Sequence, residues 1–284
     1  MIDFPHCKIN LGLNITEKRK DGFHNLETIF VPVPVRDVLE IVVQQDYHTD
    51  IPVIFTSSGI SIPGTTENNL CVKAWHLLKQ DYPDKIKPVA IHLIKHIPIG
   101  AGLGGGSSNG AFALKILNKL FFLNLSRQQL IHYALVLGSD CPFFIYDTPC
   151  YATGRGEHLT PLNLNLAHYH LLIVNPGIHI NTGLAFKAIT PKPGPGNLFK
   201  VPELPLSRWQ QVLVNDFQQP VSAEYPVIAA LIAELQSAGA GYAAMSGTGS
   251  TVFGIFENKQ SLEETRAKIQ QANPAFYTRA VALQ

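Results

Sequence analysis

The sequence predicts an α+β protein of two domains, and three observations lead to this fold class. The chain has 284 residues, whereas one hydrophobic core usually serves about 100 to 200 residues. Apolar residues make up 46% of it and charged residues 15%, which is ample material for packed cores. The hydrophobic pattern also starts afresh beyond residue 160. We therefore expect a domain over residues 1–160, a second over 161–284, and an active site in the cleft between them.

The first third of the chain is expected to consist mainly of strands. β-branched and aromatic residues predict strands over 7–15, 26–43 and 89–93. Asn68 and Asn69 are typical caps for a helix over about 70–80. The strand at 89–93 stops at Pro98, and a glycine-rich turn follows directly.

Two helices are expected after that turn. The apolar stripe of the first consists of Ala111, Leu114, Leu117 and Leu120. Ser126 with Gln129 forms a capping-box pattern for the second helix. Gly138 is expected to end this helix in a left-handed conformation.

The second half is expected to combine helices with antiparallel strands on one sheet. The expected elements are strands over 168–175, 251–256 and 276–283 and a helix over 224–237 that Gly239 ends. Ser261 with Glu264 is expected to cap one more helix. The proline-rich stretch 191–205 fits a surface loop better than a mobile lid. The second glycine-rich turn, 246–250, fits either a phosphate contact or a tight connection.

Charge and cysteine usage exclude several classes of protein. The formal net charge is +1, and Lys and Arg form no block that could neutralise a run of phosphates, which argues against nucleic acid as a partner. The cysteines are Cys7, Cys71, Cys141 and Cys150, and none has the short spacing of a zinc or redox pair. Neither a signal peptide nor an apolar run long enough to span a membrane is recognisable. We expect a cytoplasmic protein with reduced thiols.

The glycine-rich turn is the strongest candidate for an anion site. It comprises Pro98, Ile99, Gly100, Ala101, Gly102, Leu103, Gly104, Gly105, Gly106, Ser107 and Ser108. Glycines let successive backbone N–H groups converge on one point, and the start of a helix adds its positive dipole end. A tight turn without a ligand needs only two or three glycines, so a phosphate-binding loop is the favoured interpretation.

The surroundings of this loop favour a polyphosphate over a dinucleotide. Gly100, Gly102 and Gly105 satisfy G-x-G-x-x-G, but a dinucleotide site expects an acidic residue about twenty positions on. From Lys85 to Ser139 the chain has no Asp or Glu. No glycine is followed by lysine, so the loop is not a Walker A motif. These observations favour a polyphosphate as the ligand of the loop.

Asp140 and Lys8 are the candidate catalytic pair. Asp140 ends the acid-free stretch among apolar residues, and Lys8 stands in an apolar strand. A charge in such surroundings is costly unless it has a partner or a task. Together the two could orient a substrate hydroxyl and take its proton during phosphoryl transfer. A structural salt bridge, or two exposed charges, is the alternative.

These motifs, in this order, resemble the GHMP kinase superfamily. The matching segments are 8–11, 98–108, 138–144 and 245–253. Asp21-Gly22-Phe23-His24-Asn25-Leu26 resembles the substrate motif of those members that act on a cytidine diphosphate-linked methylerythritol. The resemblance implies transfer of the γ-phosphoryl group of ATP, accompanied by Mg²⁺, to the 2-hydroxyl of the methylerythritol unit in isoprenoid precursor synthesis.

The resemblance also implies roles for single residues. Lys8 and Asp140 fall on the catalytic positions and Pro98 to Ser108 on the ATP loop. The substrate positions are Asn10, Phe23, His24, Thr182 and Phe186. Two aromatic rings sandwich the cytosine in this pattern; the first is commonly tyrosine and here is Phe23, which keeps the ring face and lacks the phenol.

Three rival functions stay open at this stage. Another kinase of the superfamily, for homoserine or mevalonate, would share the glycine loop but would give no reason for aromatic rings to flank a base. A non-catalytic sensor would not need both Lys8 and Asp140. A dehydrogenase lacks its ribose-binding carboxylate.

Overall fold

The computed structural model of the chain describes residues 1–44, 51–194, 196 and 198–283. They form two compact units, each built from separate stretches of chain. Unit 1 consists of Met1–Cys7, Val35–Ile99 and Gly104–Asp147, and unit 2 of Lys8–Pro34, Gly100–Leu103 and Thr148–Gln284. A single division near residue 160 assumes one continuous piece of chain for each domain, whereas these units are interleaved along the sequence.

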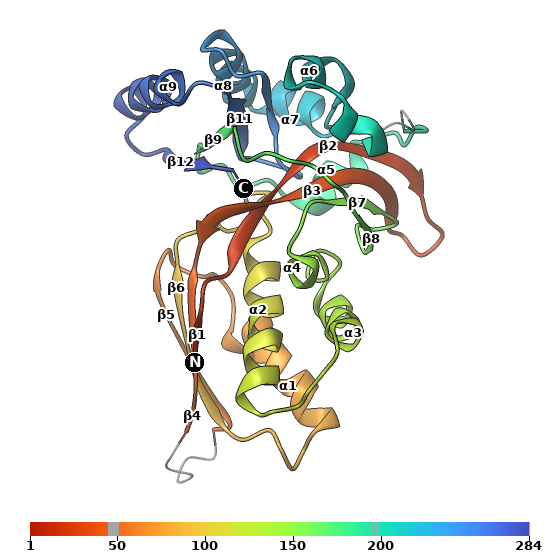
Figure 1. The fold of residues 1–284 in the computed structure, drawn as a ribbon, viewed down its shortest axis with the longest axis vertical. Helices are drawn as coiled ribbons and strands as arrows, with labels where there is room; N and C mark the ends of the chain where they lie inside the picture. The colour runs from red at the N-terminus through yellow and green to blue at the C-terminus, as the bar shows by residue number, and fades with distance from the viewer. Residues whose placement is uncertain (45–50, 195, 197, 284) are drawn as a thin grey trace. The chain divides into compact units, whose positions relative to one another are not determined.

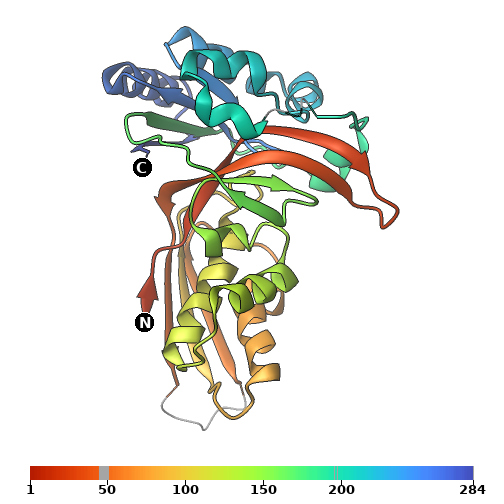
Figure 2. The same cartoon turned by 45° about the vertical axis from the view of Figure 1, so that its right-hand side comes forward.

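Unit 1 is a four-stranded sheet with helices on one face. Its strand order is β1 (Ile2–Asp3), β4 (Val38–Val43), β6 (Val89–Lys95) and β5 (Val53–Gly59). Neighbouring strands are antiparallel, except that β5 and β6 are parallel. The helices are α1 (Leu70–Asp81), α2 (Gly105–Leu120), α3 (Arg127–Leu137) and α4 (Phe143–Tyr146), with a 3-10 turn at Thr66–Asn68. Since α1 packs on β5 and α2 on both α1 and β4, these two helices cover the same face (Figure 1 and Figure 2).

Local sequence signals account for the helix ends of unit 1, with one exception. The side chain of Asn69 accepts a hydrogen bond from Cys71 N, which confirms the predicted start of α1. Ser126 and Gln129 form the predicted capping box of α3. Gly138 does end α3, but the left-handed conformation predicted for it is wrong, because its φ of 168° is extended. The chain reverses instead in a turn in which Cys141 N donates to Gly138 O (3.1 Å).

Unit 2 contains two four-stranded sheets. The first has the order β2 (His6–Lys18), β3 (His24–Arg36), β7 (Cys150–Thr153) and β8 (His158–Pro161), of which the terminal residues of β2 and β3 belong to unit 1. The second has the order β10 (Tyr242–Met245), β11 (Val252–Phe256), β9 (His170–Asn175) and β12 (Tyr277–Ala282), and all its neighbours are antiparallel. The predicted antiparallel sheet of the second half is thereby confirmed.

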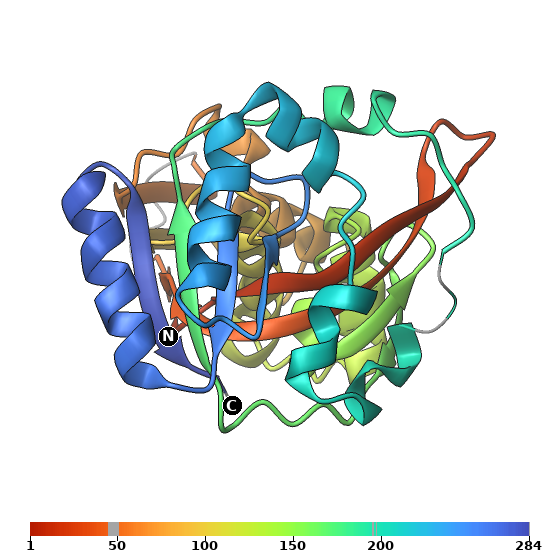
Figure 3. The same cartoon turned by 90° about the horizontal axis from the view of Figure 1, so that it is seen from above.

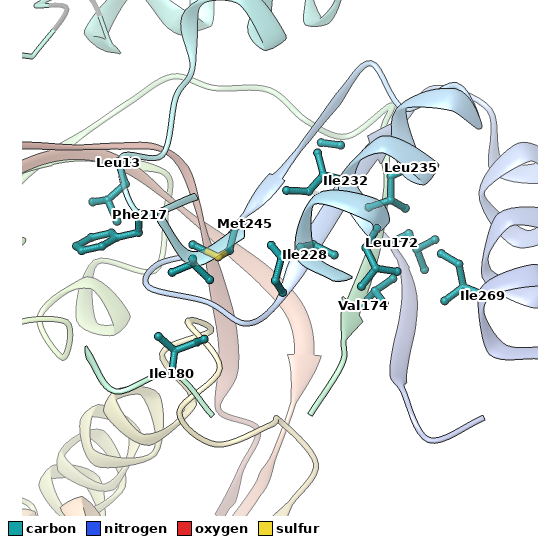
Figure 4. Close-up of a cluster of buried hydrophobic side chains, with 14 of the residues drawn as sticks. Leu13, Leu172, Val174, Ile180, Phe217, Ile228, Ile232, Leu235, Met245 and Ile269 are labelled. Carbon is teal, nitrogen blue, oxygen red and sulfur yellow. The ribbon is translucent and has the colours of Figure 1, made fainter. Parts of the chain in front are cut away.

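The core of unit 2 lies between the second sheet and two helices. α8 (Pro226–Ser237) packs on β10 and β11, and α9 (Lys259–Ala272) on β9 and β12 (Figure 3). Figure 4 shows the cluster of apolar side chains that fills this interface, among them Leu172, Ile228, Leu235, Met245 and Ile269. Burial of these side chains holds the sheet and its helices together.

The remaining elements of unit 2 are short. They are α5 (Thr182–Lys187), α6 (Trp209–Val212), α7 (Gln218–Glu224) and 3-10 helices at Leu198–Glu203 and Leu206–Arg208. The 3-10 helix at Leu198–Glu203 lies within the proline-rich stretch and buries Leu198 and Val201. Residues 195 and 197 of that stretch lie outside the described residues, and the preference for a surface loop over a lid stays a prediction.

The cap of α9 differs from the prediction. Ser261 with Glu264 is wrong as the capping pair, because α9 already begins at Lys259. Asn258 is the N-cap, and its side chain accepts hydrogen bonds from the backbone N–H groups of Gln260 and Ser261. Ser261 therefore lies inside the first turn of α9. Asn258, three residues earlier, caps the helix in its place.

Strand β2 is tied to the C-terminal part of the chain within unit 2. Leu13 forms a parallel bridge with Asn215. Leu13 N donates to Val214 O (2.8 Å), and Asp216 N donates to Leu13 O (2.8 Å). Ile15 N donates to the Asp216 carboxylate (2.8 Å). The N-terminal hairpin and the C-terminal sheet thus form one folded body.

All four cysteines are free, as the sequence predicts, and all four are buried. Burial raises the pKa of Cys7 and of Cys71 to about 12, so these thiols stay protonated and unreactive at neutral pH. Within the described part of the chain, no helix combines the length and apolar composition needed to cross a membrane.

Candidate active site

The glycine-rich loop connects β6 to α2, in the strand-to-helix context that the sequence predicts. Its residues Gly100–Leu103 belong to unit 2, and Gly104 to Ser108 belong to unit 1. Helix α2 begins at Gly105, and its N-cap Gly104 adopts a left-handed conformation (φ 68°) with no side chain to cap the helix. The first amides of a helix need partners from outside it. This helix start therefore presents N–H groups and a positive dipole end to an anion.

Within unit 2, the second glycine-rich turn packs directly on this loop. Ser246 Oγ donates to Gly102 O (2.8 Å). A Cβ atom at Gly102 would overlap the carbonyl oxygen of Ser246, and one at Gly247 would lie 3.0 Å from Gly102 Cα. Both glycines have positive φ angles, +75° and +57°. This turn therefore supports the loop through close backbone packing, and a contact between the turn and phosphate stays a prediction.

Lys8 and Asn10 also contact the loop's unit 2 part. Lys8 N donates to Leu103 O (2.9 Å). Lys8 is only 4% exposed, and its ammonium donates to Asn10 Oδ1 (2.5 Å). The Asn10 amide in turn donates to Thr28 Oγ1 (3.0 Å), which fixes which end of the amide faces Lys8. Unit 2 thereby brings the predicted catalytic lysine and the predicted substrate residue Asn10 together beside the loop.

Within unit 1, a buried ion pair supports the start of α2. Lys95 Nζ donates to the carboxylate of Asp37 and to Asn109 Oδ1 (3.0 Å), and all three side chains are buried. The other Asp37 oxygen accepts from His96 N (2.7 Å) and Ile97 N (2.9 Å). A Cβ at Gly105 would lie 2.9 Å from Lys95 Nζ. The ammonium therefore lies directly against the first residue of the helix.

Asp140 belongs to the same unit as the helical part of the loop. It directly precedes Cys141, whose thiol forms a hydrogen bond with Ser107. Burial, and then the nearby Asp140 carboxylate, raise the pKa of Cys141 to about 12, while the Ser107 bond lowers it. Within unit 1, Asp140 is therefore one residue away from a side chain that contacts the end of the loop.

The predicted substrate residues of unit 2 fall into two groups. The rings of His24 and Phe186 stack at 5.0 Å and 28°, and Phe186 also meets the edge of Phe217 at 4.8 Å. Burial, and then the nearby Lys18 charge, lower the pKa of His24 below its ordinary value of 6.5, so His24 is neutral at pH 7. Thr182 Oγ1 lies 3.4 Å from Thr248 Oγ1 on the second glycine-rich turn.

Phe23 stands in a different contact, on the hairpin between β2 and β3. Its ring lies under the guanidinium of Arg155 at 4.1 Å. Sequence reasoning missed Arg155, Asp37 and the loop contact of Ser246. Their partners are distant in sequence, so no local pattern marks them. The one local indication was the stretch without Asp or Glu, which contains both Lys95 and the loop.

The loop offers one protein oxygen whose chemistry suits a magnesium ion. Over residues 1–44, 51–194, 196 and 198–283, no group of three or more His, Cys, Asp and Glu side chains is arranged to hold a metal. Ser108 Oγ, in the first turn of α2, is buried without a hydrogen-bond partner. Magnesium takes few protein ligands and prefers oxygens together with substrate phosphates, so this hydroxyl suits it.

Alanine at two positions of the loop is expected to have opposite effects on stability. Gly102→Ala forces a left-handed alanine into the Ser246 carbonyl and should lower the free energy of unfolding by at least about 2 kcal/mol. Gly106→Ala meets no described atom within 4 Å and lies in a helix, where alanine is favoured by up to about 1 kcal/mol. Thermal unfolding of the two variants measures the difference, and equal midpoints would contradict the packing of the two turns.

Two models of known families match this chain. The first, GHMP kinases N terminal domain, matches residues 69–148, and the second, GHMP kinases C terminal, matches residues 205–275. The 4-diphosphocytidyl-2-C-methyl-D-erythritol kinase of Bacteroides fragilis is 47% identical over 262 residues, which cover 92% of this chain and 94% of that protein. The protein of the same name from Cytophaga hutchinsonii is 46% identical over 272 residues, covering 95% and 98%.

Solved structures agree with these relatives. A crystal structure of 4-(cytidine 5'-diphospho)-2C-methyl-D-erythritol kinase superposes with a TM-score of 0.80 at 27% identity and covers 100% of both chains. The mevalonate kinase of Methanococcus jannaschii gives 0.72 at 14% identity and covers 100% of this chain and 98% of its own. At 14% sequence identity, this superposition shows only that the two proteins share a fold. Together the matches confirm the predicted α+β fold with N- and C-terminal domains.

Proposed function

The chain belongs to the GHMP kinases, in the family of 4-diphosphocytidyl-2-C-methyl-D-erythritol kinases, and from this premise we propose that it transfers the γ-phosphoryl group of ATP to the 2-hydroxyl of 4-diphosphocytidyl-2-C-methyl-D-erythritol. The observation that carries the proposal is the set of contacts around one loop. Lys8 and the turn at Ser246 bond to its first half. Asp140 adjoins Cys141, which bonds to Ser107 at its end.

ATP binding is assigned to the loop Pro98 to Ser108. A triphosphate carries several negative charges, and the start of α2 offers backbone N–H groups and a positive dipole end. The Lys95 ammonium, paired with Asp37, lies against Gly105 and supports this helix start. Ser108 Oγ is the protein oxygen that would hold Mg²⁺, which when bound to the phosphates neutralises part of their charge.

Phosphoryl transfer needs an oriented hydroxyl and a place for its proton. The acceptor oxygen forms a bond to the γ-phosphorus, the bond from that phosphorus to the β,γ-bridging oxygen breaks, and ADP leaves. Asp140 accepts the hydroxyl proton or orients the hydroxyl. Lys8, held by Asn10, positions the acceptor and offsets the charge near it.

The cytidine part of the acceptor is assigned to the aromatic residues of unit 2. His24 and Phe186 offer ring faces, and neutral His24 can both donate and accept hydrogen bonds at the cytosine edge. Phe23 offers a further face for stacking, with Thr182 as an additional substrate contact. We place the enzyme in the cytoplasm, which suits its four free thiols.

An acceptor comparison tests this assignment. ADP release by the purified protein is measured with MgATP and one of three alcohols: 4-diphosphocytidyl-2-C-methyl-D-erythritol, homoserine or mevalonate. We expect turnover with the first alone, and a product mass increased by one phosphoryl group. CMP should raise the melting temperature, because a ligand that binds only the folded state stabilises it. Turnover of homoserine or mevalonate, without any effect of CMP, would overturn the proposal.

A further inference from the structure

The turn between β7 and β8 brings Arg155 to the hairpin that carries Phe23. β3 and β7 pair Thr28 with Ala152 and Ile29 with Tyr151. The ladder continues beyond this pairing, since Leu26 N donates to Gly154 O (2.7 Å). The residue after Gly154 is therefore level with the start of β3, next to Phe23 and His24.

The backbone that presents Arg155 is held on both sides. Gly154 and Gly156 have positive φ angles, +68° and +103°, so the turn needs both glycines. Gly156 N donates to Thr153 O (3.1 Å), and Arg155 N donates to the carboxylate of Glu157. The turn that carries the Arg155 guanidinium is therefore held in one backbone conformation.

The guanidinium covers one face of the Phe23 ring. Its carbon lies 4.1 Å from the ring centroid, while Phe23 as a whole is 52% exposed. A planar guanidinium stacks on an aromatic ring, whereas a lysine ammonium is a point charge that does not. The backbone is held as well, because Phe23 N donates to Asp21 Oδ1 (3.1 Å). An exposed ring is therefore kept in one orientation before any ligand arrives.

We propose that Arg155 is a positioning residue for pyrimidine recognition: it fixes the Phe23 ring so that the ring's open face is ready to stack on the cytosine of the acceptor. This inference rests on the proposed function. A phenylalanine side chain at a hairpin tip otherwise loses rotamer freedom when a base stacks on it, and fixing it beforehand reduces that cost. Arg155 acts through the ring and contributes to acceptor affinity, with no part in the chemical step.

The test compares Arg155→Gln with the wild-type enzyme in binding and in kinetics. We expect Arg155→Gln to raise the Kd of CMP and the KM of the cytidylyl acceptor about three- to fivefold, as for loss of a half-exposed cation–π contact. The kcat and the KM of ATP should stay unchanged. Arg155→Lys should recover only part of the loss. Arg279→Gln is the matched control, because it removes another guanidinium–ring contact of unit 2, with Tyr277 at 5.0 Å.

A double-mutant cycle separates positioning from direct contact. In a Phe23→Leu background, Arg155→Gln should have no further effect on the Kd of CMP. An undiminished effect there shows that Arg155 touches the ligand itself and overturns the inference, as does an Arg155→Gln variant that binds like the wild type. If the wild-type enzyme neither binds CMP nor phosphorylates the cytidylyl acceptor, the proposed function falls as well.

Discussion

Asp140→Asn should lower kcat about a thousandfold, while the affinity for ATP changes less than about threefold. An amide has nearly the shape of the carboxylate but cannot take the proton of the acceptor hydroxyl, and a positioned general base contributes typically 10²- to 10⁴-fold. Because this interaction is made mainly in the transition state, the loss should appear in kcat. Steady-state kinetics with saturating MgATP and acceptor measure it.

Asp81→Asn is the matched control for this variant. Asp81 is the last residue of α1 and accepts a hydrogen bond from the Tyr133 hydroxyl (2.6 Å), within the same unit as Asp140. The same chemical change there should leave kcat within about twofold, since no reacting group is involved. Undiminished turnover of Asp140→Asn would remove Asp140 from the mechanism.

Lys95→Met should lower the free energy of unfolding by about 3 to 5 kcal/mol, the usual cost of breaking a buried ion pair by removing one partner. Asp37 is fully buried, so its carboxylate would be left without the ammonium that neutralises it. Urea unfolding followed by circular dichroism measures the change. Lys115→Met is the control: its ammonium lies 3.7 Å from the half-exposed Asp147 and 3.9 Å from the Phe112 ring, so we expect a loss of about 1 kcal/mol.

A second substitution distinguishes the charge from the packing at this position. Asp37→Asn in the Lys95→Met background removes the orphaned charge and keeps a carbonyl oxygen for the N–H groups of His96 and Ile97. The double variant should therefore be more stable than Lys95→Met alone. If it is less stable, the ion pair is not what supports the start of α2.

Local signals in the sequence were sufficient for most elements of the fold. Asn69, Ser126 and Gln129 act within one helical turn of themselves, and the structure has their helices where these residues predict them. In both wrong predictions, of the Gly138 conformation and of the α9 cap, a residue three positions away determines the local backbone. The backbone after Gly138 follows a turn set by Cys141, and Asn258 precedes and outcompetes the signal at Ser261.

The candidate site is less local, and this limited what the sequence alone could predict. The glycine loop is one continuous segment between a strand and a helix, so its place was predictable. The support of Gly102 by Ser246, of Gly105 by Lys95 and Asp37, and of Phe23 by Arg155 depends on pairings between distant segments. Neither the register of two strands nor the partner of a buried charge can be recognised from a periodic pattern in the sequence.

The hydrogen bonds between β2 and residues 214–216 affect when the protein can fold during its synthesis on the ribosome. The β2–β3 hairpin is translated first, yet an isolated hairpin is only marginally stable in water. Its partners at Val214, Asp216 and Ser246 emerge much later. The contacts that hold β2 against these residues therefore cannot form in a nascent chain until its last quarter has been synthesised.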